Sequence, residues 1–466
     1  MFRKARHIHF VGIGGSGMSG IAEVLVNLGY NVSGSDLNAS DATRRLKRLG
    51  TKIFKGHKAD HVAAADVVVV SSAVKPENPE IVEARRCKIP VIPRAEMLAE
   101  LMRMKYGVAV AGAHGKSSTT AMIAVVLTAG GLDPTVVIGG RVKALRSGAK
   151  LGKGEFMLAE ADESDGSFLK MKPTIAVVTN IDREHLDHYD NLGEIQDAFV
   201  QFLSRVPFYG AAVVCLDEPN VRAILPRVDR KIITYGLSSD ADLVATDVVF
   251  EGFGCSYVAR RRGVKLGTVR LPVPGRHSVY NSLAAVATGL ELDVPFAKIV
   301  KALGRFHAVD RRFQMKGEAF GAMVVDDYGH HPTEIQATLA AAREGFGART
   351  VVVFQPHRYS RTRALLEEFG RAFVLADHVI VTRVYAAGEA PIPEVDGAAV
   401  ADALVRHGHP SVAYEPRLDK IPGRLKESVL PGDLVITLGA GDVFKVGDAF
   451  LTLGSKGGRA RGGRAR

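Results

Sequence analysis

The sequence contains no tryptophan and only three cysteines, Cys87, Cys215 and Cys255. These cysteines are far apart and form no Cys-x-x-Cys pair, so neither a zinc site nor a disulfide framework is expected. No apolar run approaches the roughly 18 residues that a membrane-spanning helix needs. The basic and then apolar start, residues 1–15, lacks a small-residue cleavage site and is interpreted as a first strand. We therefore expect a cytoplasmic protein without membrane insertion.

Composition points to an ordinary globular protein and excludes disorder and fibres, because hydrophobic residues make up 47% and charged residues 24% of the chain. At 466 residues, two or three domains are expected. The net charge is +11, with several of the positive residues in the Gly-rich end. Residues 455–466 are predicted to be a disordered basic tail rather than an RNA-binding arm. No stripe of aromatic and basic residues occurs elsewhere, so no nucleic-acid partner is expected.

Short apolar runs alternate with helix-length amphipathic stretches through almost the whole chain. This alternation predicts an α/β fold with mostly parallel sheets. Three such series fit the length, with boundaries near residues 105 and 310. We expect domains at residues 1–105, 106–310 and 311–454.

The first domain carries Gly12-x-Gly14-x-x-Gly17 between a strand and a helix, with Asp36 at the end of the next strand. A dinucleotide-binding fold places its tight turn, its close phosphate approach and its ribose-binding acid at these positions. A diphosphate linked to a ribose is supplied by NAD and equally by a UDP-sugar. The alternative is a Gly-rich turn that binds nothing.

A lysine loop, "GAHGKSS" at residues 112–118, follows the strand "GVAVA" and opens a helix. It departs from the full phosphate-loop pattern because Val110 stands where the first glycine would be. Lys116 would neutralise the outer phosphates of a nucleotide, and the hydroxyl of Ser117 would hold Mg²⁺. Ser117 and Ser118 could also be ordinary helix caps, but capping does not explain the lysine.

Acidic residues follow two further strands of the same domain. Because parallel strands end at one edge of a sheet, these carboxylates and the lysine loop predict a Mg²⁺-nucleotide site for ATP hydrolysis or phosphoryl transfer. The residues concerned are Glu160, Asp162, Glu163 and Asp165 after the first of these strands, and Asp182, His185 and Asp187 after the second.

The third domain has two polar loops at strand ends. Paired arginines at such a position suit a carboxylate or phosphate ligand, because the guanidinium fork donates two parallel bonds. The histidines could equally be satisfied loop residues that orient the backbone. The loops contain Tyr328, His330 and His331 in the first, and His357, Arg358 and Arg361 in the second.

The ordered combination of these motifs resembles the Mur ligases over about residues 6–454. The motifs are "HFVGIGGSGMSGIAEVL", "GAHGKSSTTAM", "EADESDGSF", "TNIDREHLDHY", "GRHSVYNSLAA", "RRFQ", "DDYGHHPTE" and "PHRYSRT". Within the family, "DDYGHHPTE" with "EADESD" favours the member that adds L-alanine over the one that attaches recycled tripeptide. The tail alone lies outside the resemblance.

The resemblance implies an ATP-dependent ligase of peptidoglycan precursor synthesis that joins L-alanine to UDP-N-acetylmuramate through an acyl phosphate. It implies a Rossmann-like UDP-binding domain, a central ATP-binding domain and a Rossmann-like C-terminal domain. The implied UDP-sugar contacts are Gly12, Gly14, Gly15, Ser16, Gly17, Asp36, Ser71 and Ser72. The implied ATP contacts are Gly112, Ala113, His114, Gly115, Lys116, Ser117, Ser118, His277 and Asn281.

The resemblance also assigns roles in catalysis. Lys116, Glu160 and His185 would be catalytic, and Ser117, Glu160 and His185 would hold Mg²⁺. The muramoyl group and the incoming amino acid would lie against Tyr328, His330, Arg358 and Arg361.

At three positions where the family usually has threonine, this sequence has Ala113, Ser117 and Ser118. At one position where the family usually has asparagine, it has Ser278. Both serines of the loop keep a hydroxyl, whereas Ala113 loses one. The Ser278 change puts one adenine contact in doubt. The lysine and the carboxylates remain, so activity is expected.

Two other functions fit parts of the sequence. The glycine loop with Asp36 would suit an NAD-dependent dehydrogenase, which has no use for the lysine loop. A nucleotide-sensing module would bind ATP without consuming it when both other substrates are supplied. The chain is expected to act as a monomer or homodimer.

Overall fold

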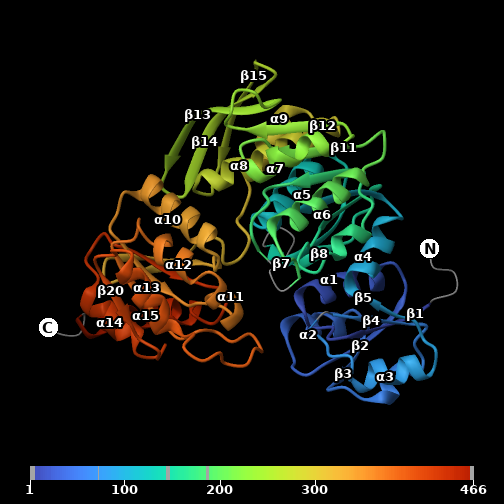
Figure 1. Cartoon of the computed structure of the whole chain (residues 1–466), viewed down its shortest axis with the longest axis horizontal. Helices are drawn as coiled ribbons and strands as arrows, with labels where there is room; N and C mark the ends of the chain where they lie inside the picture. Colours follow the sequence, from blue (N-terminus) through green and yellow to red (C-terminus); the bar gives the residue numbers. More distant parts are fainter. Residues whose placement is uncertain (1–5, 72, 143–146, 185–187, 462–466) are drawn as a thin grey trace. The chain divides into compact units, whose positions relative to one another are not determined.

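The computed structural model describes residues 6–71, 73–142, 147–184 and 188–461. The chain forms two compact units. The first unit consists of residues 1–248, 257–270 and 279–309, and the second of residues 249–256, 271–278 and 310–466. In Figure 1 the chain colours run from blue at the N-terminus to red at the C-terminus.

The first sheet lies in the first unit and is wholly parallel, in the order β3-β2-β1-β4-β5. Its strands are β1 (His7–Val11), β2 (Asn31–Asp36), β3 (Lys52–Lys55), β4 (Val67–Val70) and β5 (Val91–Pro93). They alternate with α1 (Ser16–Asn27), α2 (Asp41–Arg48), the 3-10 helix η1 (Ala59–Val62), α3 (Pro79–Arg86) and α4 (Arg94–Met102). Side-chain caps mark the start of two helices. Ser40 and Thr43 form a capping box at the N-terminus of α2, and Asn78 caps the N-terminus of α3.

The second sheet has the order β15-β14-β13-β12-β11-β10-β6-β9-β7-β8. Its strands are β6 (Tyr106–Ala111), β7 (Thr135–Val142), β8 (Ser147–Lys150), β9 (Phe156–Glu160), β10 (Ile175–Val178), β11 (Ala211–Cys215), β12 (Ile232–Gly236), β13 (Leu243–Glu251), β14 (Gly254–Arg261) and β15 (Val264–Leu271). The helices between and after them are α5 (Lys116–Gly130), η3 (Ser167–Lys170), α6 (Leu192–Ser204), α7 (Pro219–Ile224), η4 (Leu225–Arg227), α8 (Arg276–Glu291) and α9 (Phe296–Leu303).

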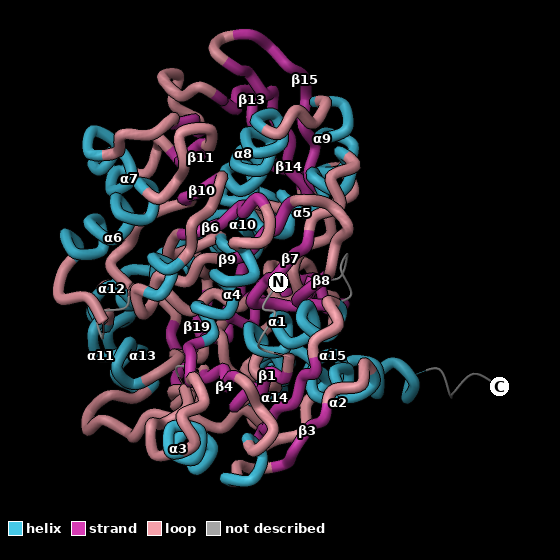
Figure 2. Tube along the Cα trace, turned by 90° about the vertical axis from the view of Figure 1, so that its right-hand side faces the viewer, coloured by secondary structure: helices cyan, strands magenta, loops and turns pink. Residues whose placement is uncertain are grey.

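The three strands predicted to end at one edge are neighbours in this second sheet. β6 pairs in parallel with β10 on one side and with β9 on the other. Figure 2 shows β10, β6, β9 and β7 in succession. Their carboxyl ends therefore bring the lysine loop and the two acidic loops to the same edge, as the sequence predicted.

The first two sheets share one buried apolar cluster. It extends from Ile8 and Phe10 of β1 through Ile21 and Leu25 of α1 to Phe168 of η3. Helix α1 contacts β2 of its own sheet and also β7 and β8 of the second sheet. Each fully buried apolar side chain of this kind contributes about 1.5–3 kcal/mol. This continuous core explains why the first sheet and most of the second belong to one compact unit.

The third sheet belongs to the second unit and has the order β16-β17-β21-β18-β19-β20. β16 runs antiparallel to β17, and the other pairs are parallel. The strands are β16 (Gln314–Ala319), β17 (Ala322–Asp327), β18 (Thr350–Phe354), β19 (His378–Val381), β20 (Val412–Tyr414) and β21 (Leu434–Leu438). The helices are α10 (Pro332–Phe346), α11 (Tyr359–Ala364), α12 (Leu366–Ala372), α13 (Gly397–Arg406), α14 (Ile421–Ser428) and α15 (Phe444–Arg461). The predicted α/β class with mostly parallel sheets is confirmed.

The C-terminal tail differs from the prediction over part of its length. We expected no structure from residue 455 onward, but α15 continues to Arg461. The buried side chains of Val446 and Phe450 anchor the start of this helix. Extending a nucleated helix costs far less than starting one, so the Gly-rich sequence continues it. Residues 462–466 lie outside the described residues.

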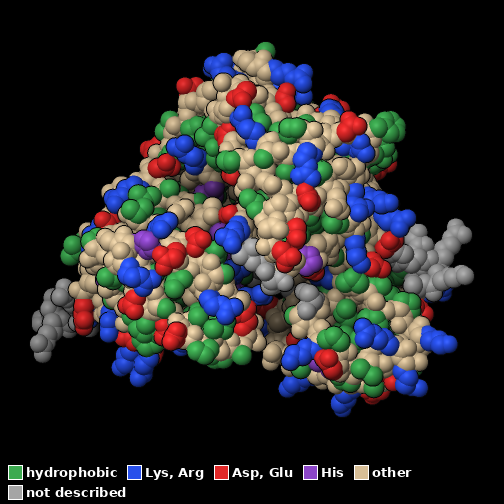
Figure 3. Space-filling view, in the orientation of Figure 1, with side chains coloured by type: hydrophobic (Ala, Val, Ile, Leu, Met, Phe, Trp, Pro, Cys, Tyr) green, Lys and Arg blue, Asp and Glu red, His purple; other side chains and the backbone are tan. Residues whose placement is uncertain are grey.

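Two further observations concern membrane-spanning helices and the distribution of surface charge. Among the described residues, no helix combines the length and the apolar character needed to cross a membrane. On the face drawn in Figure 3, Lys and Arg side chains are interspersed with Asp and Glu side chains. The positive net charge therefore does not gather into one patch on this face.

Candidate functional site

The glycine loop follows β1 and is held by the last two residues of β2. The N–H groups of Gly12 and Ile13 donate to the carbonyl of Ser35 at 2.9 and 3.0 Å. The N–H of Gly14 donates to Oδ2 of Asp36 at 2.8 Å. A Cβ atom at Gly14 would lie only 2.7 Å from that oxygen, so a larger residue there would have to displace the Asp36 carboxylate. The structure thus brings Gly12, Gly14 and Asp36 together as the sequence predicted.

The loop leads into the N-terminus of α1, which suits an anionic ligand. Gly15 is the N-cap residue, and the first turn carries no acidic side chain. The backbone N–H groups of such a turn, together with the helix dipole, favour a phosphate. A Cβ atom at Gly17 would lie 2.8 Å from Nη1 of Arg94. The lack of a side chain at Gly17 therefore leaves room for the Arg94 guanidinium beside the start of α1. Arg94 in turn pairs with Asp162 at 3.1 Å.

Three of the predicted UDP-sugar contacts are serines. Ser71 follows β4, and its hydroxyl accepts from the N–H of Ala73 at 3.2 Å. Ser16 begins α1, but its side chain is outside the described part of the structure. Ser72 lies outside the described residues.

The lysine loop begins at Gly112, two residues after the position of the first glycine in a full phosphate loop. Gly112 has φ +131°, and a Cβ atom there would collide with Oγ1 of Thr179. Val110 is a buried residue of β6 that pairs with Glu160 and Val177 on the adjacent strands. The strand therefore continues through Val110, and the turn starts where the backbone becomes left-handed.

Asn180 fixes the middle of the lysine loop. Its Oδ1 accepts from the N–H of His114 at 2.8 Å, and its Nδ2 donates to the carbonyl of the same residue at 2.9 Å. Thr179 donates to that carbonyl at 2.7 Å. No role was predicted for Thr179 or Asn180 from the sequence. Their position directly after β10, beside a glycine-rich turn, could have identified them as candidates for holding the loop.

Lys116 forms a buried ion pair with Glu163. Nζ lies 2.7 Å from Oε1 of Glu163, whose side chain is 3% exposed, and it also donates to the carbonyl of Gly112 at 2.6 Å. Burial alone would lower the pKa of Lys116, but Glu163, Asp162 and Glu184 outweigh it and raise this pKa above its usual value. The lysine is therefore firmly protonated, as a phosphate-binding lysine must be.

Carboxylates surround the lysine at the edge of the second sheet. Glu160 ends β9 and is half-buried. Asp162 has a lowered pKa, because Lys116, Ser164 and Arg94 together outweigh the effect of burial. Asp182 lies 3.0 Å from Nε2 of His114.

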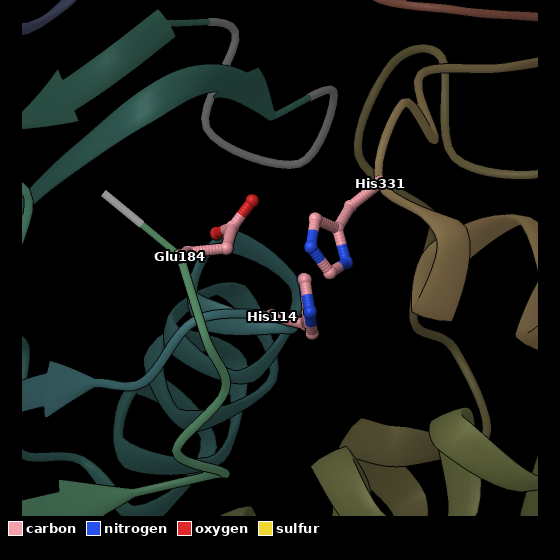
Figure 4. A group of neighbouring side chains, drawn as sticks. All are labelled: His114, Glu184 and His331. Atoms are coloured by element: carbon pink, nitrogen blue, oxygen red, sulfur yellow. The ribbon is translucent and has the colours of Figure 1, made fainter. Parts of the chain in front are cut away.

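Figure 4 shows His114 and Glu184, which come from the loops after β6 and β10, with their side chains turned toward one another. The same view labels His331, which belongs to the second unit. His185 and Asp187 lie outside the described residues.

Asn281 of α8 lies against the lysine loop. Its Oδ1 accepts from Oγ1 of Thr119 at 3.1 Å. A Cβ atom at Gly115 would lie 2.7 Å from the same oxygen. Asn281 therefore adjoins the start of α5, while the adenine contact proposed for it stays a prediction.

In the second unit, Arg311 connects two neighbouring strands of the third sheet, β17 and β21. Its Nε lies 2.9 Å from Oδ2 of Asp326 on β17, and its Nη2 donates to the carbonyl of Gly439 after β21 at 2.6 Å. The guanidinium also covers the rings of Tyr328 and Phe444, at 5.1 and 4.8 Å from their centroids. From the sequence, this arginine was recognised only as part of the "RRFQ" motif, with no role predicted for it.

The two predicted polar loops of the second unit meet. The ring of His330 lies edge-on to the rings of Tyr328 and His357, at 5.4 and 5.5 Å. Nη1 of Arg361 lies 3.4 Å from Nδ1 of His357. Burial, His330 and the neighbouring arginines lower the pKa of His357 to about 3, so its imidazole is neutral. Arg358 is exposed and caps α11 with φ +68°.

His277 lies in the second unit at the start of α8. Burial is the main reason that its pKa falls to about 4, and the guanidinium of Arg312 adds to the effect while Glu334 opposes it. The imidazole is therefore neutral at physiological pH, as expected for a side chain that would contact a base.

This shift predicts a pH dependence of stability. The folded pKa of His277 is about 4 against 6.5 in the unfolded chain, so the unfolded state binds more protons between these values. Stability should therefore fall as the pH is lowered from about 6.5 to 4. Thermal unfolding of His277→Gln should show a shallower fall in this range than the wild type. The same change at the exposed His307 should leave the slope unaltered; equal slopes for all three proteins would contradict the prediction.

The geometry defines an α/β protein with a lysine loop of the phosphate-binding type, carboxylates at the same sheet edge, and a separate glycine loop. Comparison with known proteins identifies the family. The Mur ligase catalytic domain matches residues 7–106, the Mur ligase middle domain residues 110–289, and the Mur ligase glutamate ligase domain residues 311–441. The chain belongs to the Mur ligase family, which confirms the resemblance and excludes the dehydrogenase.

The chain is similar to UDP-N-acetylmuramate–L-alanine ligases along nearly its whole length. It is 59% identical to the protein of that name from Geobacter sp. (strain M21) over 452 residues, covering 97% of this chain and 98% of that protein. It is 56% identical to the one from Myxococcus xanthus, covering 97% and 96%. The crystal structure of UDP-N-acetylmuramate-alanine ligase from Thermotoga maritima matches with a TM-score of 0.81 and 30% identity, covering 97% of this chain and 99% of that one.

Proposed function

We propose that this chain joins L-alanine to the lactyl carboxylate of UDP-N-acetylmuramate, using ATP and releasing ADP and phosphate. The observation that carries the proposal is the Lys116–Glu163 pair at the sheet edge, in the same unit as the glycine loop. The lysine loop suits the polyphosphate of ATP, and the glycine loop suits the diphosphate of the UDP-sugar. The names of relatives at 56–59% identity support the same acceptor and amino acid.

Lys116 would neutralise charge on the transferring phosphoryl group. Its Nζ is already held at the loop by Glu163 and by the carbonyl of Gly112. Gly115, with φ +82°, directs the first turn of α5 toward the loop, and that turn has no acidic residue. A preorganised cation and N–H groups of this kind stabilise the developing charge without reorganisation.

The residues at this edge fit Mg²⁺, which prefers oxygen ligands. Ser117 is half-buried at the start of α5, and Glu160 is half-buried at the end of β9. We propose that these two side chains and His185 hold the ion. Bound Mg²⁺ would offset the negative charge of the phosphates.

The other contacts that we propose are those that the family resemblance implies. The glycine loop, with Gly15, Ser16, Gly17, Ser71 and Ser72, would bind the UDP moiety, and Ala113, His114, Ser118, His277 and Asn281 would contact ATP. In the second unit, Tyr328, His330, Arg358 and Arg361 would position the muramoyl group and the amino acid. The muramoyl carboxylate would accept the phosphoryl group, after which the amine of L-alanine displaces phosphate.

The departures from the family leave the loop intact. The N–H of Ala113 donates to the carbonyl of Asn180 at 3.4 Å, which needs no hydroxyl. Ser278 is buried and donates to the carbonyl of Pro274 at 2.7 Å, so its hydroxyl serves the start of α8. We infer that activity survives both changes.

The proposal places the enzyme in the cytoplasm, as a monomer or homodimer acting early in peptidoglycan precursor synthesis. Selecting alanine over glycine depends on one methyl group, worth roughly 1–3 kcal/mol. Modest discrimination between these amino acids is therefore expected.

The test is phosphate release from ATP with UDP-N-acetylmuramate present, measured with and without L-alanine. Release is expected only when both substrates are supplied, together with a product carrying the new amide. Release that ignores both substrates would overturn the ligase assignment, and binding of ATP without any turnover would favour the nucleotide-sensing module.

A further inference from the structure

A buried carboxylate lies beneath the glycine loop and has no role in the function proposed above. Glu80 of α3 is 0% exposed. Its oxygens accept from the hydroxyl of Ser35 at 2.5 Å and lie 2.5 Å from Nδ1 of His61 and 3.1 Å from Nδ1 of His57. Nε2 of His9 lies 3.8 Å away.

Glu80 is ionised despite its burial. Burial alone would raise its pKa, but the neighbouring His9 and the hydrogen bonds with Ser35 and His61 overcome this and lower the pKa to about 2. Taking a charge out of water is costly, and well-packed apolar residues often stabilise a core equally well. Strongly perturbed groups of this kind concentrate at functional sites.

Ser35 connects this carboxylate to the glycine loop. Its hydroxyl donates to Glu80, while its own carbonyl accepts from the N–H groups of Gly12 and Ile13. The next residue, Asp36, accepts from the N–H of Gly14. The glycine loop is therefore held by acceptors on the last two residues of β2, Ser35 and Asp36. Glu80, which lies on α3 and is 45 positions further along the chain, accepts a hydrogen bond from Ser35 and so fixes it in place.

We propose that Glu80 is a positioning residue for the glycine loop, holding the end of β2 so that the N–H groups at residues 12–14 keep the arrangement that binds the diphosphate. The identity of that ligand as a UDP moiety rests on the proposed function. The positioning itself concerns the free protein and is measurable without any ligand.

The experiment compares Glu80→Gln with Glu83→Gln in the full chain. Both changes remove one carboxylate from α3, but Glu83 pairs with Arg86 at the surface, away from the cluster. The first readout is amide hydrogen exchange of residues 12–14 without ligand, with residues 112–116 of the same unit as the internal reference. The second is the affinity for UDP alone and for a non-hydrolysable ATP analogue.

Glu80→Gln should accelerate exchange at residues 12–14 and weaken UDP binding by about tenfold, with ATP-analogue binding unchanged. Glu83→Gln should change none of these. Ser35→Ala should reproduce the effect, and the Glu80→Gln/Ser35→Ala double variant should be no worse than either single variant, since both act through one hydrogen bond.

Unchanged exchange at residues 12–14 in Glu80→Gln would overturn the proposal. Equal acceleration at residues 112–116 would also overturn it, because Glu80 would then support the whole unit rather than the loop. A wild-type protein that binds no UDP would instead refute the proposed function, while the exchange data would still decide the role of Glu80.

Discussion

Replacing Lys116 by alanine is expected to lower the rate of phosphate release at least a hundredfold, with ATP and both other substrates saturating. Removing one preorganised group that stabilises transition-state charge typically costs 10²–10³ in kcat. Lys116 is the cation that the second sheet holds at the carboxyl ends of β6, β9 and β10. The effect should therefore appear mainly in kcat rather than in the KM for L-alanine. Steady-state kinetics of phosphate release measures both.

A second variant separates catalysis from folding. Lys116→Ala leaves the buried carboxylate of Glu163 without its cation, which itself destabilises the protein. Lys116→Ala/Glu163→Gln removes that charge and should recover thermal stability but not activity. Lys170→Ala breaks an exposed pair with Glu96 in the same unit and should leave the rate unchanged. Recovery of activity in the double variant would assign Lys116 a structural role only.

Replacing Arg311 by methionine is expected to destabilise the second unit by about 3 kcal/mol, since it removes one partner of a largely buried ion pair. Asp326 is 1% exposed, and burial already raises its pKa despite the arginine. The substitution also removes the donor to Gly439, so β17 and β21 lose a side-chain connection at their ends. Methionine keeps the length of the side chain, which limits the change to charge and hydrogen bonds. Denaturant-induced unfolding of the full chain measures the effect.

The matched control is Arg417→Met, which breaks an exposed pair with Asp419 in the same unit and should produce no measurable change. Arg311→Met/Asp326→Asn should recover much of the lost stability, because it removes the buried charge along with its partner. If instead the two substitutions destabilised the protein additively, so that the double variant were less stable than Arg311→Met, the ion pair would not be the origin of the effect.

The local parts of the site could be predicted from the sequence because they depend on residues close together in the chain. A glycine loop between strand and helix needs left-handed backbone, and glycines at positions 12, 112 and 115 supply it. Lys116 follows such a turn directly and begins α5. Hydrophobic alternation then indicated parallel strands, whose ends meet at one edge.

The partners of these residues could not be read from the sequence. Four acidic residues lie within six positions at the end of β9, and the sequence gives no reason why Glu163 should pair with Lys116. That choice depends on the register of β6 and β9 and on the direction of the turn after β9. For the same reason the hydrogen bonds of the Asn180 side chain to the backbone of His114, 66 positions away, required the structure.

The sequence by itself determined the α/β class, the two phosphate-type loops and the family, since periodicity and short motifs are properties of neighbouring residues. Only the tertiary structure decided which charged side chains are buried together, as for Lys116 with Glu163, Arg311 with Asp326, and Glu80 with its histidines. A buried charge is stable only beside a complementary group. Which group that is depends on strand order and helix placement, and these are set by the packing of the whole unit.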